Sequence, residues 1–395
     1  MLDQQQNQES AAEYFPVPLD ELKASGDIVR LLPERILNLG RSNFGDRRVV
    51  LGEAPGLQDS IHRQHKDLFD HYKNLKSLDW DEQEFRFADC IPEFAQKDDD
   101  SELMTDNTAY QWEGDSMVAN ALGKVVHNVV TNSEAILGYG QIVTNENLHA
   151  LTYTDISRMA FADPMTIMRR ILSFKELHER MAHLGEIFDR ARIAAAKYDL
   201  GQATKEEVMG DIVLFFCALP TLESMQFMGS FSVTFGYGEL GRFMPVVSAV
   251  QKICQDEFEV HIPFNLAIVR NILSFPEGRD TFARIRPQVV ELVRSVHQSE
   301  VDWINHTTHG RKLPTSFDRD GLLEFNNYRG TYMARFFEIE KEVGFKLVDR
   351  NPLNYMEKWT NISKTQTSPQ EQDNNQYKLN ILDRDDRGLV LTFPL

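Results

Sequence analysis

Residues 222–227 read Leu-Glu-Ser-Met-Gln-Phe, and residues 255–261 read Gln-Asp-Glu-Phe-Glu-Val-His. Both stretches lie in runs rich in Phe, Met and other apolar residues, which indicates two helices buried in a core. A carboxylate in such a place is costly unless it is paired with a positive charge or bound to a metal ion. Glu223 and Glu257 therefore each need a partner, and a metal ion shared with the nearby imidazole of His261 would satisfy that need.

The rest of the chain is predicted to be almost entirely helical. Helical spacing of apolar residues recurs over about 57–78, 115–139, 141–160, 165–199, 204–241, 243–275, 279–305 and 319–343. Strands are not expected in number, because sustained alternation and two-residue hairpin turns are scarce. We predict an N-terminal extension over residues 1–55 that is partly disordered, an all-α domain over 56–360, and a flexible tail over 361–395.

Composition excludes several classes of protein. The net charge of −18, from 42 basic and 60 acidic residues, argues against a nucleic-acid partner, which needs clustered Lys and Arg. The cysteines Cys90, Cys217 and Cys254 show no CxxC spacing, and the apolar helical surroundings of Cys217 and Cys254 suit reduced thiols. The apolar run 212–222 is too short to span a bilayer, and the first residues carry no export signal. The sequence therefore predicts a cytoplasmic protein without a membrane span.

Two carboxylate and imidazole pairs lie on different predicted helices. Glu146 and His149 are three residues apart, which places them on one helical face, and Tyr153 follows one turn later. Glu257 and His261 form the second pair, four residues apart. Either pair alone is more often a surface pair or a satisfied core histidine than a metal site.

Single acids on two further helices complete the pattern. Glu223 lies on its own helix, and Asp115 is the best-placed acid on the earliest of the four, although it could instead cap that helix. Glu113 competes with Asp115 but, two residues away, should face elsewhere. Two Glu/His pairs and two further carboxylates on four helices are typical of the di-iron and di-manganese centres of ferritin-like bundles.

These motifs resemble those of the small, radical-generating subunit of class I ribonucleotide reductases, over about Leu57 to Leu395. The resemblance implies an all-α, ferritin-like bundle that binds two irons, with manganese as the alternative, and that reacts with O₂. It implies that the ligands are Asp115, Glu146 and His149 for the first metal and Glu223, Glu257 and His261 for the second. It further implies a stable radical on Tyr153 in an apolar pocket of Phe227, Phe231 and Ile253.

The same resemblance implies a route for the radical and a partner. Trp80, Asp256 and His149 resemble the hydrogen-bonded relay to the metal site, and Glu371 and Tyr377 resemble the relay in the tail. The final Phe393-Pro394-Leu395 resembles the apolar anchor that docks in a groove of the large subunit. The family also implies a homodimer and the reduction of ribonucleoside diphosphates to deoxyribonucleotides.

One spacing departs from the family pattern. Its second pair is Glu-x-x-His, whereas Glu257 and His261 are four apart, with Glu259 as an alternative acid that should point away. Residues four apart still share a helical face, and a π-type bulge would absorb the additional residue.

Two other functions stay open from the sequence. A related dimetal-carboxylate oxygenase or oxidase would act directly on a bound substrate and would not need Glu371, Tyr377 or the apolar terminus. A non-catalytic helical interaction protein would leave its acids solvated and bind no stoichiometric metal. The GxGxxG match at residues 236–241 lacks a preceding strand, so it indicates the glycine-rich end of a helix and not a dinucleotide site.

Overall fold

The computed structural model describes residues 46–53, 56–58 and 63–360, so most of the predicted N-terminal extension and the whole predicted tail lie outside the described residues. The α-helices are α4 (Lys66–Ser77), α5 (Ile91–Phe94), α6 (Asp99–Val129), α7 (Ser133–Ala160), α8 (Thr166–Ser173), α9 (Lys175–Asp199), α10 (Lys205–Thr221), α11 (Met228–Gly238), α12 (Met244–Asp256), α13 (Ile262–Ser274), α14 (Pro276–Thr308), α15 (Arg319–Phe336) and α16 (Tyr355–Thr360). Two short 3₁₀ turns precede α5, η1 (Glu82–Glu84) and η2 (Phe87–Cys90). Two π-helices, η3 (Leu222–Phe227) and η4 (Glu257–His261), join α10 to α11 and α12 to α13.

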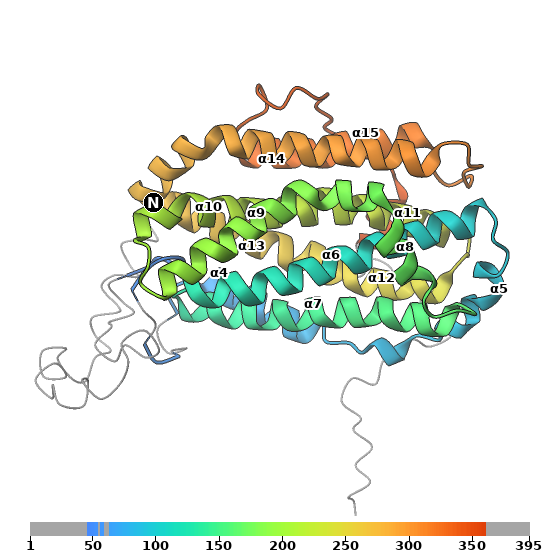
Figure 1. The fold of residues 1–395 in the computed structure, drawn as a ribbon, viewed down its shortest axis with the longest axis horizontal. Helices are drawn as coiled ribbons and strands as arrows, with labels where there is room; N and C mark the ends of the chain where they lie inside the picture. Colours follow the sequence, from blue (N-terminus) through green and yellow to red (C-terminus); the bar gives the residue numbers. More distant parts are fainter. Residues whose placement is uncertain (1–45, 54–55, 59–62, 361–395) are drawn as a thin grey trace, which may run out of the picture.

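The long helices form an elongated bundle (Figure 1). Helix α6 packs against α7 and α9, and α10 packs against α9, α13 and α14. Helices α14 and α15 lie together along one side of the bundle, while α7 runs along the opposite side (Figure 1). In the described part of the chain, the β-type pairing consists of a single isolated bridge between Val50 and Val130, so the predicted all-α class is confirmed.

The boundary between the first two long helices differs from the sequence-based expectation of about residue 140. Helix α6 begins at Asp99, where the Asp98 side chain accepts a hydrogen bond from the Ser101 N–H, and α7 begins after Asn132, whose side chain caps Ala135 N–H. Gly138 lies inside α7 because Phe264 packs there: a Cβ on Gly138 would lie 2.3 Å from the Phe264 ring. Asp115 is consequently in the middle of α6 and does not cap it.

Three other helix boundaries were also predicted wrongly. The predicted helix 165–199 is interrupted at Phe174, which is extended (φ −101°, ψ 97°) and packs its ring against Trp303 and His306. Helix α4 begins at Lys66 and not near residue 57, and α15 ends at Phe336 and not near 343. Tertiary contacts, which periodicity cannot register, decide such interruptions.

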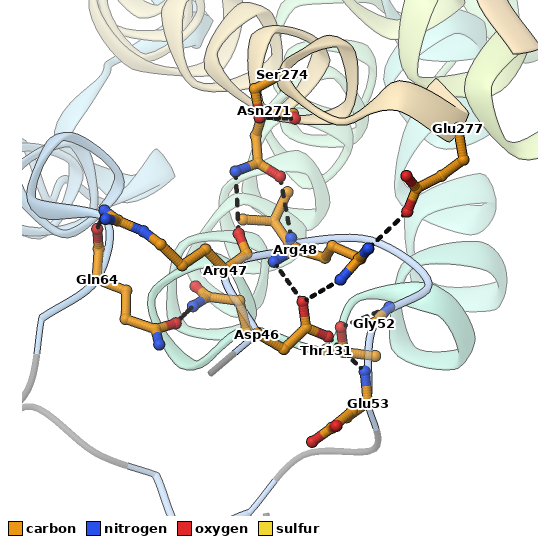
Figure 2. A network of polar contacts seen from close by, with 12 residues as sticks. Asp46, Arg47, Arg48, Gly52, Glu53, Gln64, Thr131, Asn271, Ser274 and Glu277 are labelled. Carbon is orange, nitrogen blue, oxygen red and sulfur yellow. Dashed lines mark hydrogen bonds and ion pairs between the residues drawn. The ribbon is translucent and has the colours of Figure 1, made fainter. Parts of the chain in front are cut away.

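Residues 46–53 are attached to the bundle by a polar network (Figure 2). Arg48 donates to Glu277 at the start of α14 and to Asp46 (2.7 and 3.0 Å), and the Val49 N–H donates to the Asn271 side chain on α13 (3.1 Å). The Gly52 N–H donates to Thr131 between α6 and α7 (3.1 Å). At one end of the bundle, this segment thus joins the α6–α7 junction to the α13–α14 junction, which are distant in sequence (Figure 2).

The run from Lys205 to Gly238 is long and apolar enough to cross a membrane by length and composition. Its most apolar window is 89% buried inside the protein, as expected of the central helix of a large bundle. The prediction based on the shorter run 212–222 had overlooked that α10, η3 and α11 are continuous.

The glycine-rich match at 236–241 ends α11, with Gly241 at φ +68°, and among the described residues no strand precedes it. The last described helix, α16, packs on α11 and α12. There Trp359 stacks on Phe235 at 5.3 Å and donates to Glu239.

Candidate metal centre

Both π-helices occur where a predicted ligand lies in the sequence. Helix η3 carries Glu223, and η4 begins with Glu257 and ends with His261. Pro263, two residues beyond His261, has no N–H to donate to the carbonyl of Glu259, four residues earlier. In a regular α-helix its ring would also crowd that carbonyl. The chain accommodates it with a wider turn. The bulge predicted from the spacing of Glu257 and His261 is therefore confirmed.

Two glutamates lie between the two imidazoles. Glu257 places one carboxylate oxygen 3.2 Å from His149 Nδ1 and the other 2.8 Å from His261 Nδ1. Glu146 does the same at 4.0 Å from His149 Nδ1 and 3.1 Å from His261 Nδ1. Each glutamate therefore faces both halves of the cluster, where the resemblance had assigned one to each metal.

The remaining two acids complete the cluster from separate helices. Asp115 on α6 offers an oxygen that, together with ligand atoms of Glu146, His149 and Glu257, forms a group whose members all lie within 4.8 Å of one another. Glu223 is close enough that Glu257, Glu146 and Asp115 all raise the pKa of its carboxyl group. The structure thus brings together all six predicted ligands, each at most 1% exposed.

Without a bound cation, the electrostatics of this cluster are unfavourable. Burial first, and then neighbouring carboxylates, raise the pKa values of Asp115, Glu146 and Glu223. Burial opposes protonation of His261, but Glu257 and Glu146 outweigh it and raise its pKa to about 10. Four carboxylates face two imidazoles, so the cluster has an excess of negative charge. Without metal ions, bound protons would have to neutralise part of that charge.

The donor set fits a pair of metal ions. Ten nitrogen and oxygen atoms of the six side chains make no hydrogen bond of good geometry, even where an imidazole lies beside a carboxylate: both carboxylate oxygens of Asp115, Glu146 and Glu257, Oε2 of Glu223, Nδ1 of His149, and both ring nitrogens of His261. Buried polar atoms are rarely left unpartnered, so such a concentration indicates ligands. Carboxylate and imidazole donors suit iron and manganese, and four carboxylates would balance two divalent ions.

Tyr153 lies one turn beyond His149 on α7 and is fully buried. Its hydroxyl makes no hydrogen bond of good geometry, but Asp115 lies close enough to interact with it. Burial, and then the charges of Asp115 and Glu257, raise the pKa of this tyrosine well above its ordinary value. The phenol is therefore neutral, shielded from water and electrostatically coupled to the metal ligands.

The predicted pocket residues Phe227, Phe231 and Ile253 are fully buried too. The two phenylalanine rings lie 5.9 Å apart, and Phe227 covers Gly114, the neighbour of Asp115, where an added Cβ would lie 2.8 Å from the ring. Their role around a radical stays a prediction.

Asp256 joins Trp80 to the cluster. Its Oδ2 accepts hydrogen bonds from Trp80 Nε1 (2.8 Å) and Asn145 Nδ2 (2.9 Å), and lies 3.2 Å from His149 Nε2. The indole also stacks on the His149 ring at 6.1 Å and 15°. The structure thus connects Trp80, Asp256 and His149, whereas Glu371 and Tyr377 lie outside the described residues.

The two competing acids point away, as the sequence predicted. Glu113 pairs with His178 on the protein surface (2.9 Å), and Glu259 interacts with Gln255 and Asn74. Sequence reasoning missed Asn145, which directly precedes Glu146 and gives no signal, because an Asn is common on exposed helix faces. It also missed a buried ion pair between Arg180 and Glu300, and a buried Arg329 that contacts η3. Arg180 could have given a signal, because it interrupts the apolar positions of α9.

Known proteins resemble this chain in sequence and in fold. A family model described as ribonucleotide reductase, small chain, matches residues 60–342. The beta subunit of ribonucleoside-diphosphate reductase from Enterobacteria phage T4 is 20% identical over 328 residues, which cover 77% of this chain and 82% of the phage protein. The ribonucleotide reductase R2 subunit from Clostridium botulinum matches with a TM-score of 0.67 at 15% identity, over 80% of this chain and 95% of that chain. An R2-like ligand-binding oxidase with a Mn/Fe cofactor matches with a TM-score of 0.51 at 15% identity, over 70% of this chain and 92% of that chain. These likenesses confirm the predicted ferritin-like helical fold.

Proposed function

Because the chain belongs to the ribonucleotide reductase small-chain family, we propose that its six buried ligands bind two metal ions and that Tyr153 carries the radical used in ribonucleotide reduction. The family is one of oxidoreductases, and the chain is the small subunit of a class I enzyme. The observation that carries the proposal is the convergence of six buried, largely unpartnered carboxylate and imidazole side chains from four separate helical runs.

The metals we propose are two iron ions, with manganese as the alternative that the same oxygen and nitrogen donors accept. Glu146 and Glu257, each of which faces both imidazoles, would hold the ions together with His149 and His261. Asp115 and Glu223 would complete the set of ligands. When bound, the ions would supply the oxidising equivalents drawn from O₂.

Tyr153 is the residue we propose as the radical site. After burial, the groups that raise its pKa are Asp115, Glu257 and Glu146, and Asp115 acts both through its charge and through its proximity to the hydroxyl. On oxidation the phenol would lose one electron and its hydroxyl proton, and Asp115 is the nearest base to receive the proton. Full burial among apolar side chains would then protect the radical from water and reductants.

The route for the radical is proposed to follow Trp80, Asp256 and His149. Asp256 accepts the indole N–H and faces the imidazole Nε2, so an electron leaving Trp80 can be accompanied by a proton shift along these hydrogen bonds. From Trp80 the route would continue through Glu371 and Tyr377 of the tail to the large subunit, where the substrate is reduced.

The partner is proposed to be the large subunit of the reductase, which family membership implies. The docking segment would be Phe393-Pro394-Leu395, beyond the described residues. A homodimer and a cytoplasmic location belong to the proposal, and the three described cysteines are free and buried, as suits a reducing compartment.

The alternative is an oxidase that acts directly on a bound substrate. Such an enzyme needs a cavity beside its metals, as the name of the R2-like ligand-binding oxidase implies for that protein. Four cavities in the described part of the chain, among them one of about 680 Å³ between α9, α14 and residues 343–345, are lined by none of the six ligands. The radical-generating function is therefore favoured.

The test is electron paramagnetic resonance on the metal-free chain after addition of Fe(II) and O₂. The parent should give a tyrosyl signal, and Tyr153→Phe should abolish it while still binding metal. Tyr139→Phe is a matched control because Tyr139 lies on the same helix, is equally buried and donates to Asn265, away from the ligands. A signal that survives in Tyr153→Phe, or disappears in Tyr139→Phe only, would rule out the assignment.

A further inference from the structure

The π-helix η3 directs the N–H that would reach the Ser224 carbonyl in a regular α-helix to other acceptors. The N–H of Met228, at the start of α11, is directed at the carbonyls of Glu223 and Met225 and so passes over the carbonyl of Ser224. Ser224 is completely buried, and water cannot satisfy that oxygen at the surface. An unpaired buried carbonyl is costly, so the wide turn is stable only if another group donates to it.

Arg329 on α15 is that donor. Its Nε donates to the Ser224 carbonyl oxygen at 2.6 Å, and its Nη2 donates to the Ser224 hydroxyl oxygen at 2.7 Å. The next residue, Gly330, brings the α15 backbone against the same turn, because a Cβ there would lie 3.3 Å from Met225 Cε and 2.8 Å from the Phe345 ring. The guanidinium fork therefore holds two adjacent acceptors of a single residue in η3.

The charge of Arg329 is not balanced in the usual way. The side chain is buried, yet among the described residues no carboxylate forms an ion pair with it, and its cation–π contact is with the Tyr332 ring at 5.2 Å. The other buried arginine, Arg180, is neutralised by Glu300. Burying a charge without a counterion is destabilising unless hydrogen bonds compensate for the lost water. The compensating hydrogen bonds of Arg329 go to Ser224 in the π turn.

We propose that Arg329 is a positioning residue that keeps η3 in its π-helical form and thereby keeps Glu223 within the metal cluster. If η3 relaxed to a regular α-helix, the additional residue of its wide turn would have to move into the neighbouring helix. Glu223 would then rotate by about 100° relative to α11, out of the cluster. The proposal depends on the function proposed above only for the role of Glu223 as a ligand.

The first test is hydrogen–deuterium exchange on the full-length, metal-free chain, measured for peptides that cover residues 222–229. Arg329→Met should speed exchange there by at least about tenfold, as expected when a charge-assisted hydrogen bond is lost. Arg329→Lys, which keeps one donor, should give an intermediate increase. Leu322→Ala is the matched control, since Leu322 is a buried residue of the same helix that makes none of these hydrogen bonds.

The outcomes separate clearly. Faster exchange in 222–229 for Arg329→Met than for Leu322→Ala supports the proposal, and equal exchange in the two variants overturns it. If Arg329→Met does not fold, Arg329→Lys decides in the same way against Leu322→Ala.

Titration with Co(II) alone, followed by its visible absorption, gives a second readout. Arg329→Lys should weaken one of two binding events by at least about tenfold, and unchanged affinity for both ions would overturn the link to Glu223. If Glu223→Ala still binds two Co(II) ions like the parent, the ligand assignment fails while the exchange result on η3 stands independently.

Discussion

Replacing Glu300 by Gln should destabilise the protein by about 3 kcal/mol, because it removes the charge that balances the buried guanidinium of Arg180. The two side chains are 1% and 2% exposed and meet through two bonds, Nε to Oε1 at 2.5 Å and Nη2 to Oε2 at 2.8 Å. Breaking a buried pair from one side typically costs about 3–5 kcal/mol.

Two features of the structure place the cost at the lower end of that range. Burial raises the pKa of Glu300 above its ordinary value even with Arg180 beside it, so its ionised form is already penalised. The Arg180 guanidinium also lies 3.4 Å from the centre of the Tyr110 ring and 4.9 Å from that of Trp303, and both rings stabilise the cation.

The assay is equilibrium unfolding in urea of the metal-free chain, with circular dichroism as the signal. The double variant Arg180→Met with Glu300→Leu removes both charges and should be closer in stability to the parent than Glu300→Gln is. A Glu300→Gln variant within 1 kcal/mol of the parent, or a double variant less stable than the single one, would refute the reasoning.

Three further predictions follow from particular contacts. Gly138→Ala should lower the free energy of unfolding by about 1–3 kcal/mol, because its Cβ would lie 2.3 Å from the Phe264 ring. Adding Phe264→Leu should restore part of this loss, as measured by urea unfolding. A Gly138→Ala variant as stable as the parent would contradict the packing. Thr204→Ala should lower the free energy of unfolding by about 1 kcal/mol, because it removes the Thr204 hydroxyl from the capping box with Glu207 at the start of α10. Thr204→Ser keeps the hydroxyl and should leave the stability unchanged. In the metal-free protein the raised pKa of His261 stabilises the fold fully below pH 6.5, and that stabilisation is lost as the pH rises to about 10. The melting temperature of the parent should fall as the pH rises across this range, and that of His261→Gln should fall less. An equal pH dependence of the melting temperature in the two proteins would count against the ion pair.

The sequence carried most of the information about the site, because its chemistry depends on residue types at helical spacing. Glu146 and His149, three apart, and Glu257 and His261, four apart, identified two ligand pairs, and the second spacing correctly indicated a π turn. The sharing of Glu146 and Glu257 between both imidazoles could not be read from spacing, since it depends on how α7 and η4 face each other.

The parts of the fold that were predicted wrongly depend on contacts between distant residues. Helix periodicity continued through Phe174, yet packing of its ring on Trp303, 129 positions later, accompanies the break between α8 and α9. The bond from Arg329 to Ser224 spans 105 positions, and Asn145 donates to Asp256 across 111. Each of these residues looks ordinary in its own helix, so its role appears only when the helices are assembled.

The most direct test of the central claim is anomalous X-ray diffraction from crystals soaked in Mn(II), recorded at the manganese absorption edge. The structure predicts two peaks for each chain, both enclosed by Asp115, Glu146, His149, Glu223, Glu257 and His261. A single peak, or manganese bound only elsewhere on the chain, would contradict the dimetal centre.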